Sequence, residues 1–147
     1  MKSTSKIRKN YIGWELSLFD RANIFRDYQF NFLKKAIDAM SKSNIVPSLF
    51  IDPDIKQIDS TLESGAECIE LHTGAYSDAT DLDHQEMEMS RLKSAAEYAS
   101  DNKIQVHAGH GLNLSNLSKV CRITQIEEVN IGHSVVALSL IHISEPT

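Results

Sequence analysis

The sequence lacks the features that mark several large classes of protein. Its 147 residues include two cysteines, Cys68 and Cys121, too few for a disulfide framework and too far apart for a zinc motif. No stretch approaches the roughly 18 apolar residues of a membrane span, and the first residues carry no apolar secretion signal. These absences predict a soluble cytoplasmic protein with reduced thiols.

Positive charge is also in short supply. The formal net charge is −5, from 15 Lys and Arg against 20 Asp and Glu. Nucleic acids and anionic membranes are bound by basic surfaces, so this balance predicts neither as a partner. The one basic cluster, within residues 2–9, is interpreted as a solvated tail.

Hairpin signals are missing as well, and helix-like and strand-like segments alternate from about residue 30 onward. Apolar residues at helical spacing predict a first helix at about 30–40, with Phe30, Leu33, Ile37 and Met40 on its buried face. Strands are expected at 45–51, 68–71, 104–106 and 128–131, and further helices after residue 52, at about 83–100 and at 115–121. Such alternation predicts parallel strands, either in a β/α barrel or in an open doubly wound sheet.

Local signals refine two of these helices. Asp52 is expected to cap the second one, with Pro53 at its first position and Gly65 closing it. Its buried face is predicted from Ile55, Ile58 and Leu62. The long helix at 83–100 should bury Leu92, Ala95, Ala96 and Ala99. Residues 1–29 show no clean period, and only a possible helix is placed there.

Titratable residues stand where the predicted strands end. Glu70 and His72 lie two apart on one strand and therefore share a face, while His110 and His133 each follow a glycine at a strand end. The carboxyl ends of parallel strands build active sites in β/α folds, so these side chains are expected to converge for proton transfer. His107 is expected to be exposed and without a role.

Glycine around these histidines favours an anion over a metal. Backbone amides at Gly109, Gly111 and Gly132 could bind phosphate, with Gly74 and the hydroxyl of Thr73 adding donors. The sequence has no H-x-H pair on one strand, no H-E-x-x-H motif and no Walker loop. A metal-dependent barrel hydrolase that uses His72, His110 and His133, or a non-catalytic phosphate-binding remnant, remains an alternative at this point.

Four segments occur in a specific order: S-L-F-I-D-P-D at 48–54, E-L-H-T-G-A-Y at 70–76, A-G-H-G-L-N at 108–113 and E-E-V-N-I-G-H-S at 127–134. Together they resemble pyridoxine 5′-phosphate synthase of the deoxyxylulose-dependent vitamin B6 pathway. The resemblance implies about four carboxyl-terminal βα units of a (β/α)8 TIM barrel that assembles into an octamer. It also implies condensation of 3-amino-2-oxopropyl phosphate with 1-deoxy-D-xylulose 5-phosphate, with no metal and no cofactor.

By the same resemblance, His110 would be the proton donor and Glu70 would stabilise a charged transition state. Gly111, Gly132 and His133 would bind the aminoketone phosphate substrate. The family's amino-terminal half, with an N-x-D-H segment, a catalytic histidine and a second glutamate, has no counterpart here. The 147-residue chain alone is therefore expected to be inactive.

Three regions are predicted along the chain. Residues 1–29 form a divergent or poorly ordered segment, and residues 30–137 form the partial barrel domain. Residues 138–147 resemble translated sequencing-adapter sequence and are predicted to be a non-native tail, with His142 carrying no function.

Overall fold

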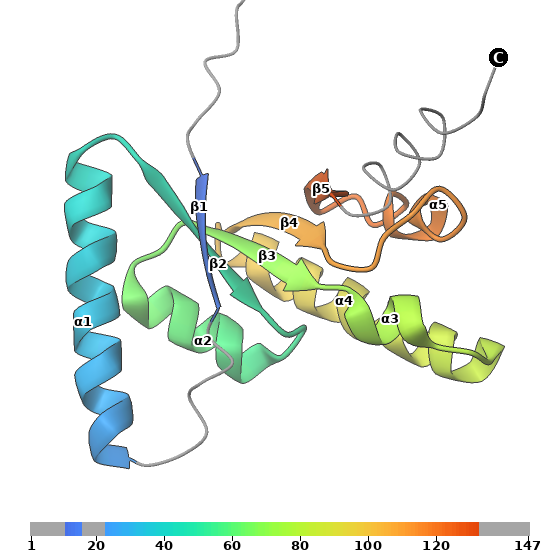
Figure 1. The fold of residues 1–147 in the computed structure, drawn as a ribbon, viewed down its shortest axis with the longest axis horizontal. Coiled ribbons are helices and arrows are strands. Elements are labelled where there is room, and N and C mark those ends of the chain that lie inside the picture. The colour runs from blue at the N-terminus through green and yellow to red at the C-terminus, as the bar shows by residue number, and fades with distance from the viewer. Residues whose placement is uncertain (1–10, 16–22, 133–147) are drawn as a thin grey trace, which may run out of the picture.

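The computed structural model describes residues 11–15 and 23–132, which form one parallel sheet with helices between its strands (Figure 1). The strands are β1 (Tyr11–Glu15), β2 (Val46–Ile51), β3 (Cys68–His72), β4 (Gln105–Gly109) and β5 (Ile126–Asn130). The helices are α1 (Asn23–Lys42), α2 (Ile55–Ser64), α3 (Gly74–Asp78), α4 (Leu82–Asp101) and α5 (Leu117–Val120).

The strand order separates the two folds that the alternation left open. The sheet runs β1-β2-β3-β4-β5 and each neighbouring pair is parallel. A doubly wound sheet reverses its order at a switch point, whereas the wall of a β/α barrel keeps the order of the sequence. The described residues therefore form a partial β/α barrel, as predicted, with β1 and β5 at its two edges.

The first strand was not foreseen. β1 lies in the region where only a possible helix was placed, and it pairs with β2 from Tyr11 opposite Val46 to Glu15 opposite Phe50. The segment Y-I-G-W-E lacks a clear strand period, although Tyr, Ile and Trp are common in strands, and its pairing with β2 identifies it as one. The first helix also begins earlier than predicted, at Asn23.

The N-cap predicted for α2 lies two residues before the one observed. Asp54, not Asp52, is the N-cap: its backbone is extended, and its carboxylate accepts a 2.7 Å hydrogen bond from the N–H of Lys56. Pro53 therefore precedes the helix. Gly65 ends α2 as predicted, in the left-handed conformation at φ 82°.

The buried face of α2 also differs from the prediction. Ile58 is buried, but Ile55 and Leu62 are 42% and 37% exposed. Thr61 and Ser64 are buried in their place, and each hydroxyl donates to a carbonyl of the same helix, at 2.9 and 2.7 Å. Those bonds offset the cost of burying the hydroxyls, which a pattern based on hydrophobicity does not register.

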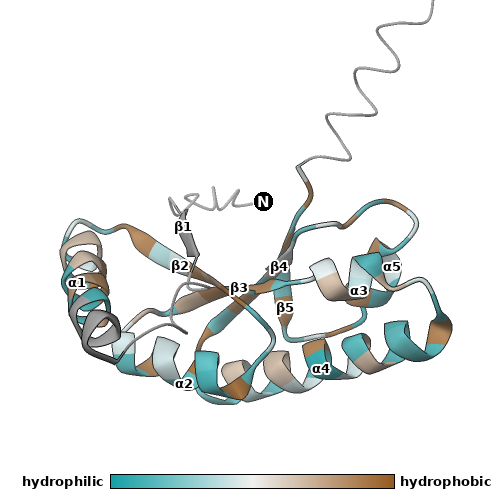
Figure 2. Ribbon diagram, turned by 60° about the horizontal axis from the view of Figure 1, so that its bottom comes forward, coloured by the Kyte–Doolittle hydropathy of each residue, from teal (hydrophilic) through white to brown (hydrophobic). Residues whose placement is uncertain are grey.

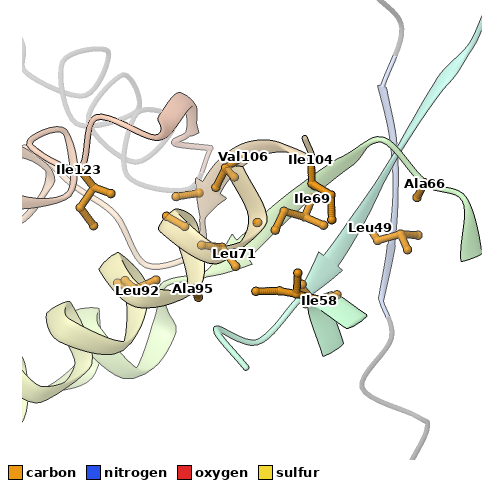
Figure 3. Close-up of a cluster of buried hydrophobic side chains, with 14 of the residues drawn as sticks. Leu49, Ile58, Ala66, Ile69, Leu71, Leu92, Ala95, Ile104, Val106 and Ile123 are labelled. Carbon is orange, nitrogen blue, oxygen red and sulfur yellow. The ribbon is translucent and has the colours of Figure 1, made fainter. Parts of the chain in front are cut away.

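The core lies between the sheet and the helices (Figure 3). From the sheet it takes the side chains of alternate residues, among them Leu49, Ile69, Leu71 and Val106. From α4 it takes the four residues that were predicted: Leu92, Ala95, Ala96 and Ala99. The alanines allow this helix to approach the sheet closely.

The two faces of the sheet are chemically different. The long helices α1, α2 and α4 lie on the same side of it (Figure 2). Because side chains alternate along a strand, the residues between the core positions point to the opposite side. That side carries Ser48, Phe50, Cys68, Glu70, His72 and His107. None of the helices in the described ranges is long and apolar enough to cross a membrane.

Candidate active site at the carboxyl ends of the strands

The strand register brings polar side chains to one edge of the sheet. His72, the last residue of β3, pairs with Gly109, the last residue of β4, and Gly109 pairs with Asn130, the last residue of β5. Residues that are far apart in the sequence therefore share one edge, which is where β/α folds place their active sites.

Glu70 is anchored across this edge. Its half-buried side chain starts on β3, and its Oε2 accepts a 2.6 Å hydrogen bond from the side-chain amide of Asn130 on β5. The carboxylate passes over Gly109 of β4, so closely that a Cβ built on Gly109 would overlap Oε1 of Glu70. Glycine at this position therefore makes room for the carboxylate.

Three rings form a cluster at the same edge of the sheet. The rings of His72 and His110 lie 4.5 Å apart between centroids, with a 45° tilt. Phe50 meets His72 edge-to-face at 5.1 Å and lies 6.4 Å from His110. The strand-end residues His72 and His110 thus converge as predicted, and an aromatic ring on β2 fixes one side of the pair.

Two further residues shape this cluster. Oδ1 of Asp52 lies 3.6 Å from Nδ1 of His72, so the carboxylate faces that ring. Gly74 lies beneath both imidazoles: a Cβ there would be 2.6 Å from Cε1 of His72 and 3.2 Å from Cδ2 of His110. A side chain at position 74 would force the rings apart.

The loop after β4 presents His110 in an uncommon conformation. His110 and Gly111 both have positive φ, at 83° and 72°. The hydroxyl of Thr73 donates to the carbonyl of His110 at 2.5 Å, and that of Ser77 approaches the same oxygen at 3.4 Å. A non-glycine residue with positive φ is held there by its surroundings, and such residues concentrate at functional sites.

The rest of this loop is braced from two sides. Nδ2 of Asn116 donates to the carbonyl of Gly111 at 3.1 Å, and its Oδ1 accepts from the N–H of Asn113 at 2.8 Å. The hydroxyl of buried Tyr76, on α3, donates to the carbonyl of Asn116 at 2.9 Å. Burial raises the pKa of Tyr76. The strand end that carries His110 is therefore tied to both flanking helices.

The predicted anion donors divide into two pairs. Gly111 and Gly132 are exposed, whereas Gly74 and Gly109 are buried under the side chains described above. The hydroxyl of Thr73 was predicted as a ligand donor, and this was wrong. Thr73 is fully buried, and its hydroxyl bonds to the carbonyls of Gly109 and His110.

His107 was expected to be exposed, and this too was wrong. It is 2% exposed, and its ring nitrogens lie 3.7 and 3.8 Å from Sγ of Cys68. That thiol lies 3.4 Å from the hydroxyl of Ser48. Burial raises the pKa of Cys68 to about 11, so the thiol is protonated at neutral pH. His107 points to the polar side of the sheet because it alternates with the core residues Val106 and Ala108.

A metal-ligand set does not form among the described residues. Across residues 11–15 and 23–132, no group of three His, Cys, Asp or Glu side chains could hold a metal ion. His133, the third ligand in the hydrolase alternative, lies outside the described residues.

Sequence reasoning missed Asn130 and Phe50 as members of the site. Asn130 stands two residues before Gly132 in the N-I-G-H segment, so its place at a strand end was a usable signal. Its contact with Glu70 spans 60 positions of sequence, and only the strand register reveals it.

A family model and individual relatives of known name point to the same family. Residues 25–145 match the family described as "Pyridoxal phosphate biosynthesis protein PdxJ". The pyridoxine 5′-phosphate synthase of Sulfurihydrogenibium sp. (strain YO3AOP1) is 47% identical over 107 residues, which are 73% of this chain and 44% of the relative. That of Legionella pneumophila (strain Corby) is 43% identical over 110 residues, 75% of this chain and 44% of the relative. The chain thus spans less than half the length of these relatives.

A solved structure supports the fold alone. The YdjI aldolase from Escherichia coli K12 superposes with a TM-score of 0.58 at 15% sequence identity. The match covers 93% of this chain and 50% of the aldolase, in keeping with part of a larger barrel.

Proposed function

Because the chain belongs to the family of pyridoxal phosphate biosynthesis protein PdxJ, we propose that it carries part of the active site of a pyridoxine 5′-phosphate synthase. The proposed reaction condenses 3-amino-2-oxopropyl phosphate with 1-deoxy-D-xylulose 5-phosphate and releases pyridoxine 5′-phosphate, phosphate and water. The observation that carries the proposal is the placement of Glu70, His72 and His110 at one edge of the sheet, with the rings of His72 and His110 4.5 Å apart.

His110 is the proposed proton donor. His110 is exposed and directly follows β4, and the hydroxyl of Thr73 donates a hydrogen bond to its backbone carbonyl. Ring closure through imine formation and dehydration needs repeated proton transfers, and an imidazole can give and take protons near neutral pH.

Glu70 is the proposed stabiliser of positive charge that develops during the condensation. Its carboxylate is fixed at a strand end, and a fixed charge need not reorganise while the transition state forms. Gly111 and Gly132, the two exposed glycines, are the proposed contacts for the phosphate of the aminoketone substrate. His133, which the family resemblance adds to this set, lies outside the described residues.

The 147-residue chain is proposed to be inactive by itself. The family's second glutamate and second catalytic histidine have no counterpart in its sequence.

For the full-length protein, an octameric assembly and a cytoplasmic location are proposed.

A complementation assay tests this function. The purified chain would be mixed with the amino-terminal half of the Sulfurihydrogenibium relative, and both substrates would be added. We expect pyridoxine 5′-phosphate, detected by mass spectrometry, from the mixture and from neither part alone.

A Glu70→Gln chain is the matched control, since it keeps the size of the side chain and removes its charge. Product from the isolated chain would refute the proposed inactivity. A mixture that assembles, binds inorganic phosphate and still makes no product would favour the non-catalytic phosphate-binding alternative.

A further inference from the structure

We propose that Asn130 is a positioning residue that fixes the carboxylate of Glu70 across strand β4. The catalytic consequence of this inference rests on the proposed function, while its geometric part stands without it. The two residues are on strands that are not neighbours: Glu70 is on β3, Asn130 is on β5, and β4 lies between them.

The span across β4 is possible because of Gly109. This glycine pairs with Asn130 in the sheet register, and Oε1 of Glu70 occupies the space that a Cβ of Gly109 would take. The same hypothetical Cβ would lie 3.1 Å from Cβ of Asn130. Three consecutive strands therefore supply a carboxylate, a gap and an amide donor that fit one another.

The hydrogen bond orients the carboxylate. A free glutamate loses side-chain entropy when it is held in one conformation. The 2.6 Å bond from Nδ2 of Asn130 to Oε2 selects one conformation, in which Oε1 lies over Gly109. Hydrogen bonds to a carboxylate are stronger than those between neutral groups, so this bond can offset part of the entropy.

Asn130 also links two parts of the proposed site. It ends β5 and stands two residues before Gly132, a proposed phosphate contact. The bond to Glu70 therefore sets the distance between the carboxylate and the strand end that leads to the phosphate site. A misplacement of about 1 Å in such a site can lower turnover roughly 100-fold.

The geometric test uses the full 147-residue chain. Three-bond couplings of the Glu70 side chain, measured by NMR, report how many rotamers it occupies. We expect one rotamer in the unchanged chain and averaging over several in Asn130→Ala. Asn102→Ala is the matched control, because the side-chain amide of Asn102 donates to the carbonyl of Tyr98 on α4, and its loss should leave Glu70 unchanged.

A second variant keeps the test decisive if Asn130→Ala does not fold. Gly109→Ala would fill the gap under the carboxylate and should also release Glu70 from Asn130. The NMR signals of the Asn130 side-chain amide should then move to the positions of a free amide. The proposal would be overturned if folded Asn130→Ala kept the original Glu70 rotamer, or if folded Gly109→Ala left the Asn130 amide signals unchanged.

The catalytic test uses the complemented synthase. Asn130→Ala should lower kcat about 10- to 100-fold with little change in KM for the aminoketone, because substrate binding is kept and only alignment is lost. An unchanged kcat beside a mobile Glu70 would overturn the positioning role. If the unchanged mixture makes no product, the proposed function fails, and the rotamer measurement still decides the role of Asn130.

Discussion

The two faces of the sheet are built from alternate residues of the same strands, yet they do different work. On the helix side, Leu71 and Val106 are buried in an apolar core. On the other side, Glu70 and His107 occupy the adjacent positions in a polar row. Adjacent residues of one strand therefore belong to the apolar core and to the polar face, respectively.

The difference lies in what holds each side chain. Core side chains are held by close packing, which tolerates changes of shape only at a cost in stability. Polar side chains on the opposite face are held by directed polar contacts, such as the amide of Asn130 on Glu70 and the thiol of Cys68 beside His107. Substitutions on the first face should therefore lower stability, and those on the second should lower activity or reactivity.

His110→Asn should have the largest effect. Asparagine tolerates the left-handed backbone that His110 adopts, so the substitution removes the imidazole without adding strain. In the complemented assay, kcat should fall about 100-fold or more, as expected for the loss of a proton donor. The thermal midpoint should stay within about 2 °C of the unchanged chain. An unaltered kcat would remove His110 from its proposed role.

Leu71→Ala should have the largest effect on stability. Leu71 is fully buried between the sheet and the helices, and its truncation should cost about 2–5 kcal/mol in the free energy of unfolding. Urea denaturation followed by circular dichroism measures this loss. Leu114→Ala is the control: this leucine is 79% exposed, and its truncation should cost less than about 0.5 kcal/mol. Equal losses would contradict the assignment of the core face.

Tyr76→Phe should have a smaller effect, near the site. It leaves the carbonyl of Asn116 without the buried hydroxyl and should cost about 1 kcal/mol. Hydrogen exchange should rise in the loop after β4 more than elsewhere. Tyr98→Phe is the matched change on the helix side, where the hydroxyl donates to Asp59 at 2.7 Å in an exposed setting. A larger loss for Tyr98→Phe would contradict the proposed bracing of the loop.

The smallest effect concerns the two thiols. At pH 8, a maleimide reagent should label exposed Cys121 quickly and buried Cys68 slowly, because the thiolate of Cys68 is disfavoured.

The raised pKa of Cys68 contributes stability that is present below pH 9.0 and is lost as the pH rises toward about 11. Cys68→Ala should lack this part of the alkaline loss in urea titrations. Equal labelling of both thiols would show that the polar face is open to solvent at Cys68.

Much of the fold could be predicted because its signals are local. The spacing of Leu33 and Ile37 indicates a helix, and the position of Gly65 indicates where another helix ends. β1 was missed because its five residues show no clean alternation, and its pairing with β2 joins segments more than 30 residues apart. The burial of Thr61 and Ser64 was missed because hydroxyls that bond to their own helix can replace apolar side chains.

The candidate site divides in the same way. Glu70, His72 and His110 were found from their places at strand ends, since parallel strands finish at one edge. Thr73 and His107 were misjudged because their burial depends on what packs around them. Thr73 is enclosed by the loop after β4, and His107 lies beside a thiol from another strand.

By itself, the sequence determined the alternation of helices and strands, the strand-end positions of His72 and His110 and the family resemblance, because each is written in neighbouring residues. Only the tertiary structure decided that the amide of Asn130 reaches Glu70 over Gly109, and that Thr73 supports the backbone of His110. These contacts depend on the register between strands, and register is fixed by the packing of the whole sheet rather than by any one segment.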